Sequence, residues 1–149
     1  MKVFVLNGPS LNLLGTREPE VYGHATLADV EAMVRARAEQ LGMQIEFRQS
    51  NIEGEIISWL HEARDKADAV VLNPAAFTHY SIAIRDAVVA CGLPVIEVHI
   101  SNVFAREPFR AHSVVSPVAR GVIVGLGVEG YVRAIEALAA SKGEQQHGS

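Results

Sequence analysis

The chain has 149 residues, of which 49% are hydrophobic and 20% are charged, and its formal net charge at pH 7 is −4. This length and composition predict a single globular domain over residues 1–149 with one hydrophobic core. A negative net charge argues against a nucleic-acid partner, which would normally bind a basic stripe. No hydrophobic run approaches the roughly 18 residues needed to cross a membrane, and no signal peptide is visible, so we expect a cytoplasmic protein.

The only cysteine, Cys91, cannot form a disulfide within the chain, which is typical of a protein from a reducing compartment. It lies near the end of a predicted helix, and no group close to it in the sequence would activate the thiol. We therefore expect Cys91 to be a buried structural residue.

The N-terminal part of the chain begins with a short apolar run at residues 2–7, which predicts a buried strand. A polar connection of 18 residues follows, at 8–25. Residues 26–41 carry apolar side chains at helical spacing, with Thr26 as the N-cap, and so predict an amphipathic helix. The alternating residues 44–49 predict a second strand nearer an edge of the sheet.

The middle of the chain continues this alternation. Residues 52–67 predict a second helix, and the apolar run at residues 69–73 predicts a buried strand of the kind found in parallel sheets. We expect a third helix at residues 81–91 and a fourth strand at residues 94–99.

The C-terminal part opens with a second long connection, of 20 residues, at 101–120. Residues 121–125 predict the fifth strand, and residues 128–140 predict the last helix. The polar residues 141–149 are expected to form a disordered tail. Five strands with helical crossovers predict an α/β fold with a flavodoxin-like, doubly wound parallel sheet. Connections as long as the two noted here are usually functional.

Polar residues gather where three of the predicted strands end. Asn7 ends the first strand, Asn73 ends the third, and Glu97, His99 and Ser101 lie at the end of the fourth. Ligands of open parallel sheets bind beyond the carboxyl ends of the strands, at the point where the strand order reverses. We therefore expect the functional site at this edge.

Glu97, His99 and Ser101 alternate along the fourth strand, so their side chains should share one face. A carboxylate beside an imidazole fixes the tautomer of the ring and favours its protonated form, which suits a general acid. The alternative is a structural Glu–His pair at the end of a strand.

The first long connection resembles a lid, because Gly15, Pro19 and Gly23 mark turns along it. It carries Tyr22 and Arg17, and a guanidinium close to a tyrosine favours the tyrosinate, which could act as a base. The alternative is a surface loop in which Tyr22 packs and Arg17 is solvated.

The second long connection carries Arg106 and Arg110, which suggest a substrate with a carboxylate or several hydroxyls. The alternative is a solvated charged loop. His79 precedes a helix, where it could donate to a ligand, although a lone histidine there is more often structural. Asp86 follows Arg85 in the third helix, and the two could form a surface charge pair.

Some chemistries are disfavoured by residues that the chain lacks. No nucleotide-binding motif is present. The histidines His79, His99 and His112 lack the tight spacing of metal-binding motifs, so we expect neither a metal nor a cofactor. None of the three lysines is placed to form a Schiff base at the predicted site. These lysines are Lys2, Lys66 and Lys142.

Three blocks of sequence together resemble the type II 3-dehydroquinate dehydratases. They are NGPSLNLLGTREPEVYG at 7–23, NPAAFTHYSIAIRDA at 73–87 and EVHISNVFAREPFRAHS at 97–113. The resemblance covers about residues 1–140. It implies a hydro-lyase of the shikimate pathway that removes water from 3-dehydroquinate by anti elimination through an enolate, without metal or cofactor. The same reaction in catabolic quinate degradation is the alternative role.

The resemblance also implies catalytic roles for five residues. Tyr22 would be the base that removes the C2 proton, with Arg17 keeping it ionised. Asn12 would hold an ordered water or the developing enolate oxygen. His99 would donate a proton to the departing C1 hydroxyl, and Glu97 would orient His99.

Seven further residues would bind the substrate, according to the same resemblance. They are Asn73, His79, Asp86, Ile100, Ser101, Arg106 and Arg110, and Arg106 would also assist near Tyr22 and the lid. The family forms homododecamers, four trimers in tetrahedral arrangement, in which Asp86 would reach the site of a neighbouring subunit. Two functions of other classes stay open: a flavodoxin-like binding module without catalysis, and a metal-dependent hydrolase built on the three histidines named above.

Overall fold

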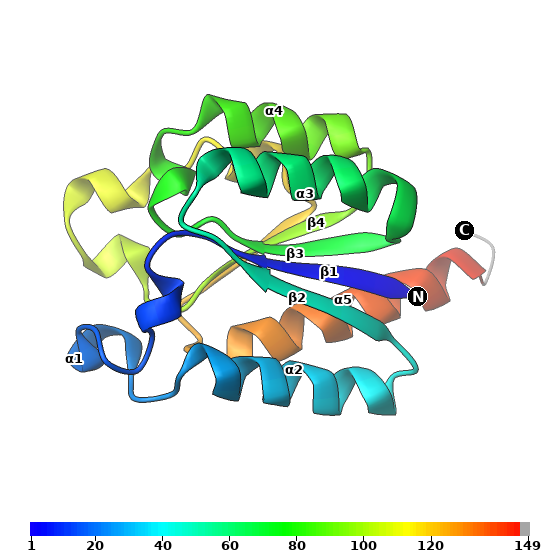
Figure 1. The fold of residues 1–149 in the computed structure, drawn as a ribbon, viewed down its shortest axis with the longest axis horizontal. Coiled ribbons are helices and arrows are strands. Elements are labelled where there is room, and N and C mark those ends of the chain that lie inside the picture. Colours follow the sequence, from blue (N-terminus) through cyan, green and yellow to red (C-terminus); the bar gives the residue numbers. More distant parts are fainter. Residues whose placement is uncertain (147–149) are drawn as a thin grey trace.

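The computed structural model describes the backbone of residues 1–146 and the side chains of residues 1–142. Its centre is a parallel sheet of five strands in the order β2-β1-β3-β4-β5, which confirms the predicted flavodoxin-like topology and places β2 at an edge (Figure 1). The strand order reverses between β1 and β3, both of which end in asparagine. The strands are β1 (Lys2–Asn7), β2 (Gln44–Gln49), β3 (Ala69–Asn73), β4 (Val95–His99) and β5 (Gly121–Val124).

Helices cover both faces of the sheet. One face carries α2 (Leu27–Gln40) and α5 (Glu129–Gln146), and the other carries α3 (Glu53–Lys66) and α4 (Ile82–Cys91) (Figure 1). Thr26 caps α2 as predicted, because its hydroxyl accepts the Asp29 amide while the Asp29 carboxylate accepts the Thr26 amide.

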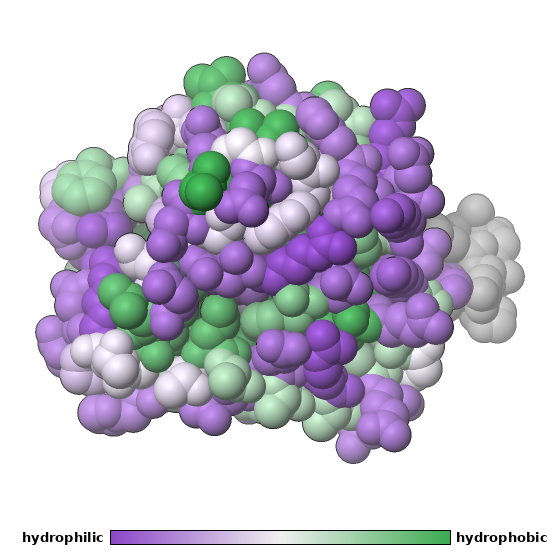
Figure 2. Space-filling view, in the orientation of Figure 1, coloured by the Kyte–Doolittle hydropathy of each residue, from purple (hydrophilic) through white to green (hydrophobic). Residues whose placement is uncertain are grey.

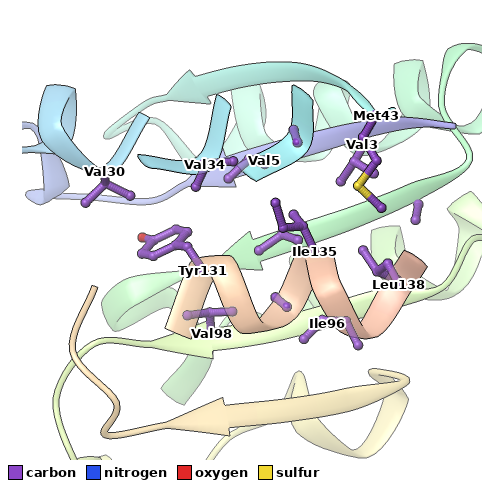
Figure 3. Packing of buried hydrophobic residues seen from close by; sticks show 14 of the residues in the cluster. Val3, Val5, Val30, Val34, Met43, Ile96, Val98, Tyr131, Ile135 and Leu138 are labelled. Carbon is purple, nitrogen blue, oxygen red and sulfur yellow. The ribbon is translucent and has the colours of Figure 1, made fainter. Parts of the chain in front are cut away.

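The core divides into two layers because alternate strand residues point to opposite faces. Val3, Val5 and Val98 pack with residues of α2 and α5, including Ile135 (Figure 3). Phe4 and its neighbours on the other face pack with α3 and α4. The surface seen in Figure 2 is mostly hydrophilic, with a smaller hydrophobic area below its centre.

Both long connections contain short helices, which the sequence patterns did not predict. The first contains η1 (Leu11–Leu13) and α1 (Pro19–Tyr22). The second contains three 3-10 turns, each fixed by a proline or an asparagine at its start. These are η3 (Val103–Ala105), η4 (Pro108–Ala111) and η5 (Ser116–Val118).

The last helix is longer than the sequence pattern predicted. We expected a disordered tail from residue 141, whereas α5 continues to Gln146. The added segment contains no proline, and four of its six residues, Lys142, Glu144, Gln145 and Gln146, favour helices, so Gly143 alone does not end the helix. Residues 147–149 lie outside the described residues.

Two further features bear on the sequence predictions. Cys91 is buried and free, as expected, and burial raises the pKa of its thiol. Among the helices of the described chain, none is long and apolar enough to span a membrane.

Candidate active site

A pocket of about 590 Å³, including its open mouth, lies beyond the carboxyl ends of β1, β3 and β4. This is the place where ligands bind in open parallel sheets. Residues from both long connections and from the strand ends line it, among them Arg17, Tyr22, Asn73, His99, Arg106 and Arg110.

Two connections approach each other closely at the floor of this region. The Gly8 amide donates a 2.8 Å hydrogen bond to the Asn73 carbonyl, joining the segment after β1 to the end of β3. A Cβ at Gly8 would lie 2.5 Å from the Pro74 carbonyl oxygen, so the backbones can meet only because residue 8 is glycine.

Tyr22 is the last residue of α1, a single helical turn. Pro19 begins the turn, and its fixed φ and missing N–H suit that position. Gly23 ends the turn with φ of +81°, a conformation that glycine adopts readily. The turn therefore holds Tyr22 at the mouth of the pocket, partly buried against the core.

Two arginines from different connections contact Tyr22. Arg106 donates 2.8 Å to the Tyr22 hydroxyl and 3.2 Å to the Ser101 hydroxyl. The Arg17 guanidinium lies 5.0 Å from the centroid of the Tyr22 ring and pairs with Glu18 at 3.3 Å. We expected Arg17 to supply the positive charge beside Tyr22. In the structure Arg17 packs on the ring, and Arg106 hydrogen-bonds the hydroxyl.

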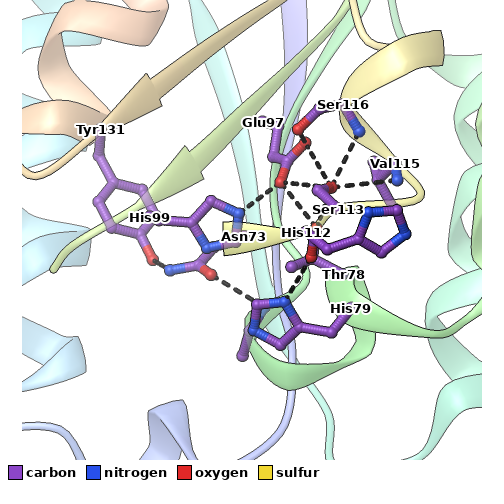
Figure 4. A network of polar contacts seen from close by, with 11 residues as sticks. Asn73, Thr78, His79, Glu97, His99, His112, Ser113, Val115, Ser116 and Tyr131 are labelled. Carbon is purple, nitrogen blue, oxygen red and sulfur yellow. Dashed lines mark hydrogen bonds and ion pairs between the residues drawn. The ribbon is translucent and has the colours of Figure 1, made fainter. Parts of the chain in front are cut away.

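His99 lines the pocket and contacts the Glu97 side chain, so their predicted contact is confirmed. His99 Nε2 hydrogen-bonds the Glu97 carboxylate (Figure 4). Glu97 is fully buried, and His99 is 7% exposed. Since the ionised carboxylate can only accept, His99 Nε2 donates, and Nδ1 remains for a ligand. Ser101 does not join the pair but contacts Arg106.

Three hydroxyls surround the buried Glu97 carboxylate (Figure 4). Thr78 donates to Oε2 at 2.7 Å, and Ser116 donates to Oε1 at 2.6 Å. The Ser113 hydroxyl lies 3.2 Å from Oε2 and also accepts the backbone amides of residues 115 and 116. Burying a charge is tolerated only when such donors replace its hydration.

These contacts decide the charge of Glu97. Burial alone would raise the pKa of the carboxyl, but hydrogen bonds from His99, Ser116 and Thr78 and the charge of His99 lower it further than burial raises it. The net result is a pKa below the ordinary value for glutamate, so Glu97 is ionised at neutral pH despite having no solvent exposure.

His79 and Arg110 are placed by contacts within the second long connection. His79 Nδ1 donates 2.7 Å to the carbonyl of His112, and its ring meets Phe109 edge-on at 6.1 Å between centroids. Arg110 pairs with Glu107 at 3.0 Å. Both His79 and Arg110 line the pocket. A ligand there can therefore hydrogen-bond to His79 Nε2 and to the guanidinium N–H groups of Arg110.

Asn73 is the last residue of β3, and both the oxygen and the nitrogen of its carboxamide form hydrogen bonds within the protein. Its Oδ1 accepts the Ala75 amide at 3.0 Å, and its Nδ2 donates 2.9 Å to the hydroxyl of Tyr131. Ala75 adopts φ of +52°, a left-handed conformation that costs a non-glycine residue about 1–2 kcal/mol. The Asn73 side chain therefore stabilises the strained turn that starts the wall of the pocket.

The structure places most of the predicted site residues in or beside this pocket. Ile100 and Ser101 line it, and Glu97 lies behind His99. Asn12 and Asp86 do not line it: Asn12 is exposed in η1, and Asp86 is exposed on α4.

Four residues that contact the site side chains were missing from the sequence prediction. Thr78, Ser113 and Ser116 donate to Glu97, and Tyr131 contacts Asn73. Isolated serines and threonines carry no spacing signal. A single buried tyrosine in an amphipathic helix looks like an ordinary core residue.

Within the described residues, no group of three or more His, Cys, Asp or Glu side chains could hold a metal ion. His79, His99 and His112 therefore do not form a ligand cluster there. The pocket lining includes no lysine; Lys66 instead pairs with Glu62 on α3.

Comparison with known proteins identifies the family of this chain. The family model described as "Dehydroquinase class II" matches residues 1–139. A 3-dehydroquinate dehydratase from Pelotomaculum thermopropionicum is 57% identical over 143 residues, which is 96% of this chain and 99% of the relative. One from Azorhizobium caulinodans is 58% identical over 140 residues, covering 94% of this chain and 95% of the relative.

A solved structure gives the same result. The type II dehydroquinase from Propionibacterium acnes superposes with a TM-score of 0.91 at 49% identity, covering 93% of this chain and 96% of the other. A family match over nearly the whole chain and relatives above 50% identity leave one assignment. The chain is a hydro-lyase and belongs to the class II dehydroquinase family.

Proposed function

We propose that this enzyme converts 3-dehydroquinate to 3-dehydroshikimate by anti elimination of water through an enolate, with Tyr22 as base and His99 as acid. One observation carries the proposal. A tyrosine whose hydroxyl accepts from Arg106 and a histidine paired with the buried Glu97 line the same pocket. The reaction needs one base and one acid, and these two side chains supply them.

The first step is removal of the C2 proton by the Tyr22 phenolate. The proton is acidic because C2 lies next to the C3 ketone, and the electrons of the broken C–H bond form the enolate. Arg106 stabilises the phenolate through its hydrogen bond and charge, since its side chain is only 14% exposed. Arg17, on the ring face, adds a second positive charge. Asn12 would hold a water or the enolate oxygen after the lid segment moves.

The second step is loss of the C1 hydroxyl. The enolate re-forms the ketone, the C1–O bond breaks, and a C1–C2 double bond appears. His99, as imidazolium, gives its Nδ1 proton to the departing hydroxyl, which leaves as water. Glu97 holds the opposite nitrogen and so keeps Nδ1 aimed at the ligand. Transfer of the proton on Tyr22 to solvent and uptake of one by His99 complete the cycle.

The remaining lining residues would bind the parts of the substrate that do not react. The Ser101 hydroxyl and the backbone of Ile100 would hold the carboxylate, His79 and Arg110 the ring hydroxyls, and Asn73 the region of the C1 hydroxyl. The absence of lysine from the pocket lining disfavours a covalent imine route.

We also propose that the enzyme acts as a homododecamer in the cytoplasm, with Asp86 contributing to the site of a neighbouring copy. Asp86 is exposed on α4 outside its own pocket, which leaves it available to another chain. We propose the biosynthetic shikimate pathway as the setting. Quinate degradation is the alternative, because it contains the same reaction. Sedimentation velocity tests the assembly, and a stable monomer would contradict it.

The proposed reaction is tested by following the ultraviolet absorbance of the conjugated enone product after dialysis of the protein against a chelator. We expect turnover by the unaltered protein and loss of about two to four orders of magnitude in Tyr22→Phe and His99→Ala, the range that general acid–base groups contribute. A folded protein without turnover both before and after dialysis would favour the binding module, and turnover that is lost only on dialysis would show that the reaction needs a metal ion.

A further inference from the structure

A tyrosine from the last helix joins the ends of two central strands beneath the pocket. Tyr131 of α5 is fully buried, and its ring packs within the core layer between the sheet and α2 (Figure 3). Its hydroxyl donates 2.7 Å to Asn7 Oδ1 at the end of β1 and accepts Asn73 Nδ2 at 2.9 Å from the end of β3. Both asparagines are buried as well.

Backbone groups at both ends fix the direction of each hydrogen bond in this series of side-chain contacts. The Ala75 amide can only donate, so the atom of Asn73 that it meets is the oxygen. The Arg48 carbonyl can only accept, so the atom of Asn7 that it meets, at 3.0 Å, is the nitrogen. The Tyr131 hydroxyl lies between the remaining Asn7 oxygen and the remaining Asn73 nitrogen. It must therefore donate to the first and accept from the second.

This arrangement leaves Asn73 with one unused N–H and no freedom to turn its carboxamide over. Turning it would set the Asn73 nitrogen against the Ala75 N–H and lose both hydrogen bonds at once. Figure 4 shows the Asn73 carboxamide hydrogen-bonded to the Tyr131 hydroxyl, and Asn73 and His99 line the same pocket. The group of Asn73 that remains for a ligand is thus a donor.

We propose that Tyr131 is a positioning residue for the dehydration, because it locks the Asn73 carboxamide with an N–H presented to the C1 hydroxyl that leaves. The inference rests on the proposed function. Burial raises the pKa of Tyr131, so its hydroxyl keeps its proton and its direction at any pH at which the enzyme works. A phenylalanine at this position would fill the same space but would leave Asn7 Oδ1 and Asn73 Nδ2 without the hydroxyl that joins them.

The test is a double-mutant cycle on kcat and KM with 3-dehydroquinate. We expect Tyr131→Phe to lower kcat by about tenfold, the effect of losing one buried hydrogen bond, with little change in KM. Asn73→Ala should lower kcat by at least as much. The double variant should be no slower than Asn73→Ala, because Tyr131 acts only through Asn73. Losses that multiply, or an unchanged kcat in a folded Tyr131→Phe protein, would overturn the proposal.

A matched control and a second readout separate this inference from the proposed function. Tyr80 is 62% exposed and outside the pocket lining, so Tyr80→Phe should leave kcat unchanged. A crystal structure of Tyr131→Phe reports the carboxamide of Asn73 whether or not the protein turns over this substrate. We expect Asn73 rotated or in two orientations. Asn73 in its original place, with a water replacing the hydroxyl, would refute the lock even if the dehydration is established.

Discussion

Removal of the Ser116 hydroxyl should change the pH dependence of the enzyme more than its maximal activity. Ser116 donates 2.6 Å to Glu97 Oε1, and it belongs to the second long connection, 19 residues from Glu97 in the sequence. In Ser116→Ala the carboxylate keeps Thr78 and His99 on Oε2 but has only the weaker Ser113 contact, 3.4 Å long, at Oε1.

The expected size follows from the hydrogen bond that is lost. A hydrogen bond to a charged group contributes about 1.5–3 kcal/mol, and water can replace part of it because Ser116 is only partly buried. We take the lower end of this energy range, which corresponds to roughly a tenfold loss in kcat/KM. The loss is expected only at acid pH, where the Glu97 carboxyl is partly protonated. Removing a donor raises the pKa of Glu97, so at acid pH a larger fraction of the variant carries a neutral Glu97 that cannot support the His99 imidazolium.

The measurement is kcat/KM from about pH 3.5 to pH 9 by the absorbance of the product, because the pKa of Glu97 lies below 4.5 and the profile must reach the region where this carboxyl titrates. The acid limb of the profile should move to higher pH in Ser116→Ala, and the two profiles should converge at alkaline pH, where Glu97 is ionised in both proteins. Ser58→Ala, at an exposed position on α3, is the matched control. Superimposable profiles, or an acid limb moved to lower pH, would refute the role assigned to the hydroxyls.

Three more perturbations follow from the same contacts. Gly8→Ala should lower the free energy of unfolding by about 1–3 kcal/mol in urea titrations and also reduce activity, because its Cβ would collide with the Pro74 carbonyl. Arg106→Gln should reduce kcat/KM by about 10- to 100-fold through loss of the charged donor to the Tyr22 hydroxyl. The hydrogen bond from Arg48 lowers the pKa of Glu62 from 4.5 to about 2, so its ionised form stabilises the fold above pH 4.5 and this stabilisation is lost as the pH falls through about 2. Glu62→Gln should therefore cost about 1 kcal/mol at pH 7 in thermal unfolding, with the difference disappearing at strongly acid pH.

Each of these has a control at an exposed position. Gly54→Ala meets no atom within 4 Å and should be neutral or slightly stabilising. Arg64→Gln on α3 and Glu39→Gln on α2 should have activity and stability close to those of the unaltered protein. Unchanged stability in Gly8→Ala would contradict the close backbone approach. Full activity in Arg106→Gln would assign the charge beside Tyr22 to Arg17, and a pH-independent effect of Glu62→Gln would remove the Arg48 pair as its cause.

The sheet could be predicted closely from the sequence because its three central strands, β1, β3 and β4, are buried on both sides. Runs such as Lys2–Asn7 and Ala69–Asn73 are apolar at almost every position, so their limits are sharp. Positions of the helices were also close, since Thr26 and Ser81 cap α2 and α4. The short helices of the connections were missed because turns of three or four residues show no periodicity.

The site could be predicted only as far as local spacing and family resemblance reach. Spacing along one strand brought Glu97 and His99 together. Spacing cannot tell which of two arginines from separate connections meets a tyrosine. The resemblance placed Arg106 near Tyr22, and in the structure Arg106, 84 residues away, donates to its hydroxyl. The partners of buried polar groups are set by tertiary packing. Tyr131, which lies 124 residues from Asn7, has no signal in the sequence that separates it from other core residues.

Exchange of the C2 hydrogen of 3-dehydroquinate with solvent, followed by proton NMR in D₂O, tests the assignment of Tyr22 as base and His99 as acid most directly. His99→Ala retains the base but lacks the acid, so it should exchange one C2 hydrogen stereospecifically, above the rate without protein, while forming little product. Tyr22→Phe should neither exchange nor eliminate. Exchange catalysed by Tyr22→Phe, or the absence of exchange in a folded His99→Ala protein that binds the substrate, would contradict a stepwise elimination through an enolate made by Tyr22.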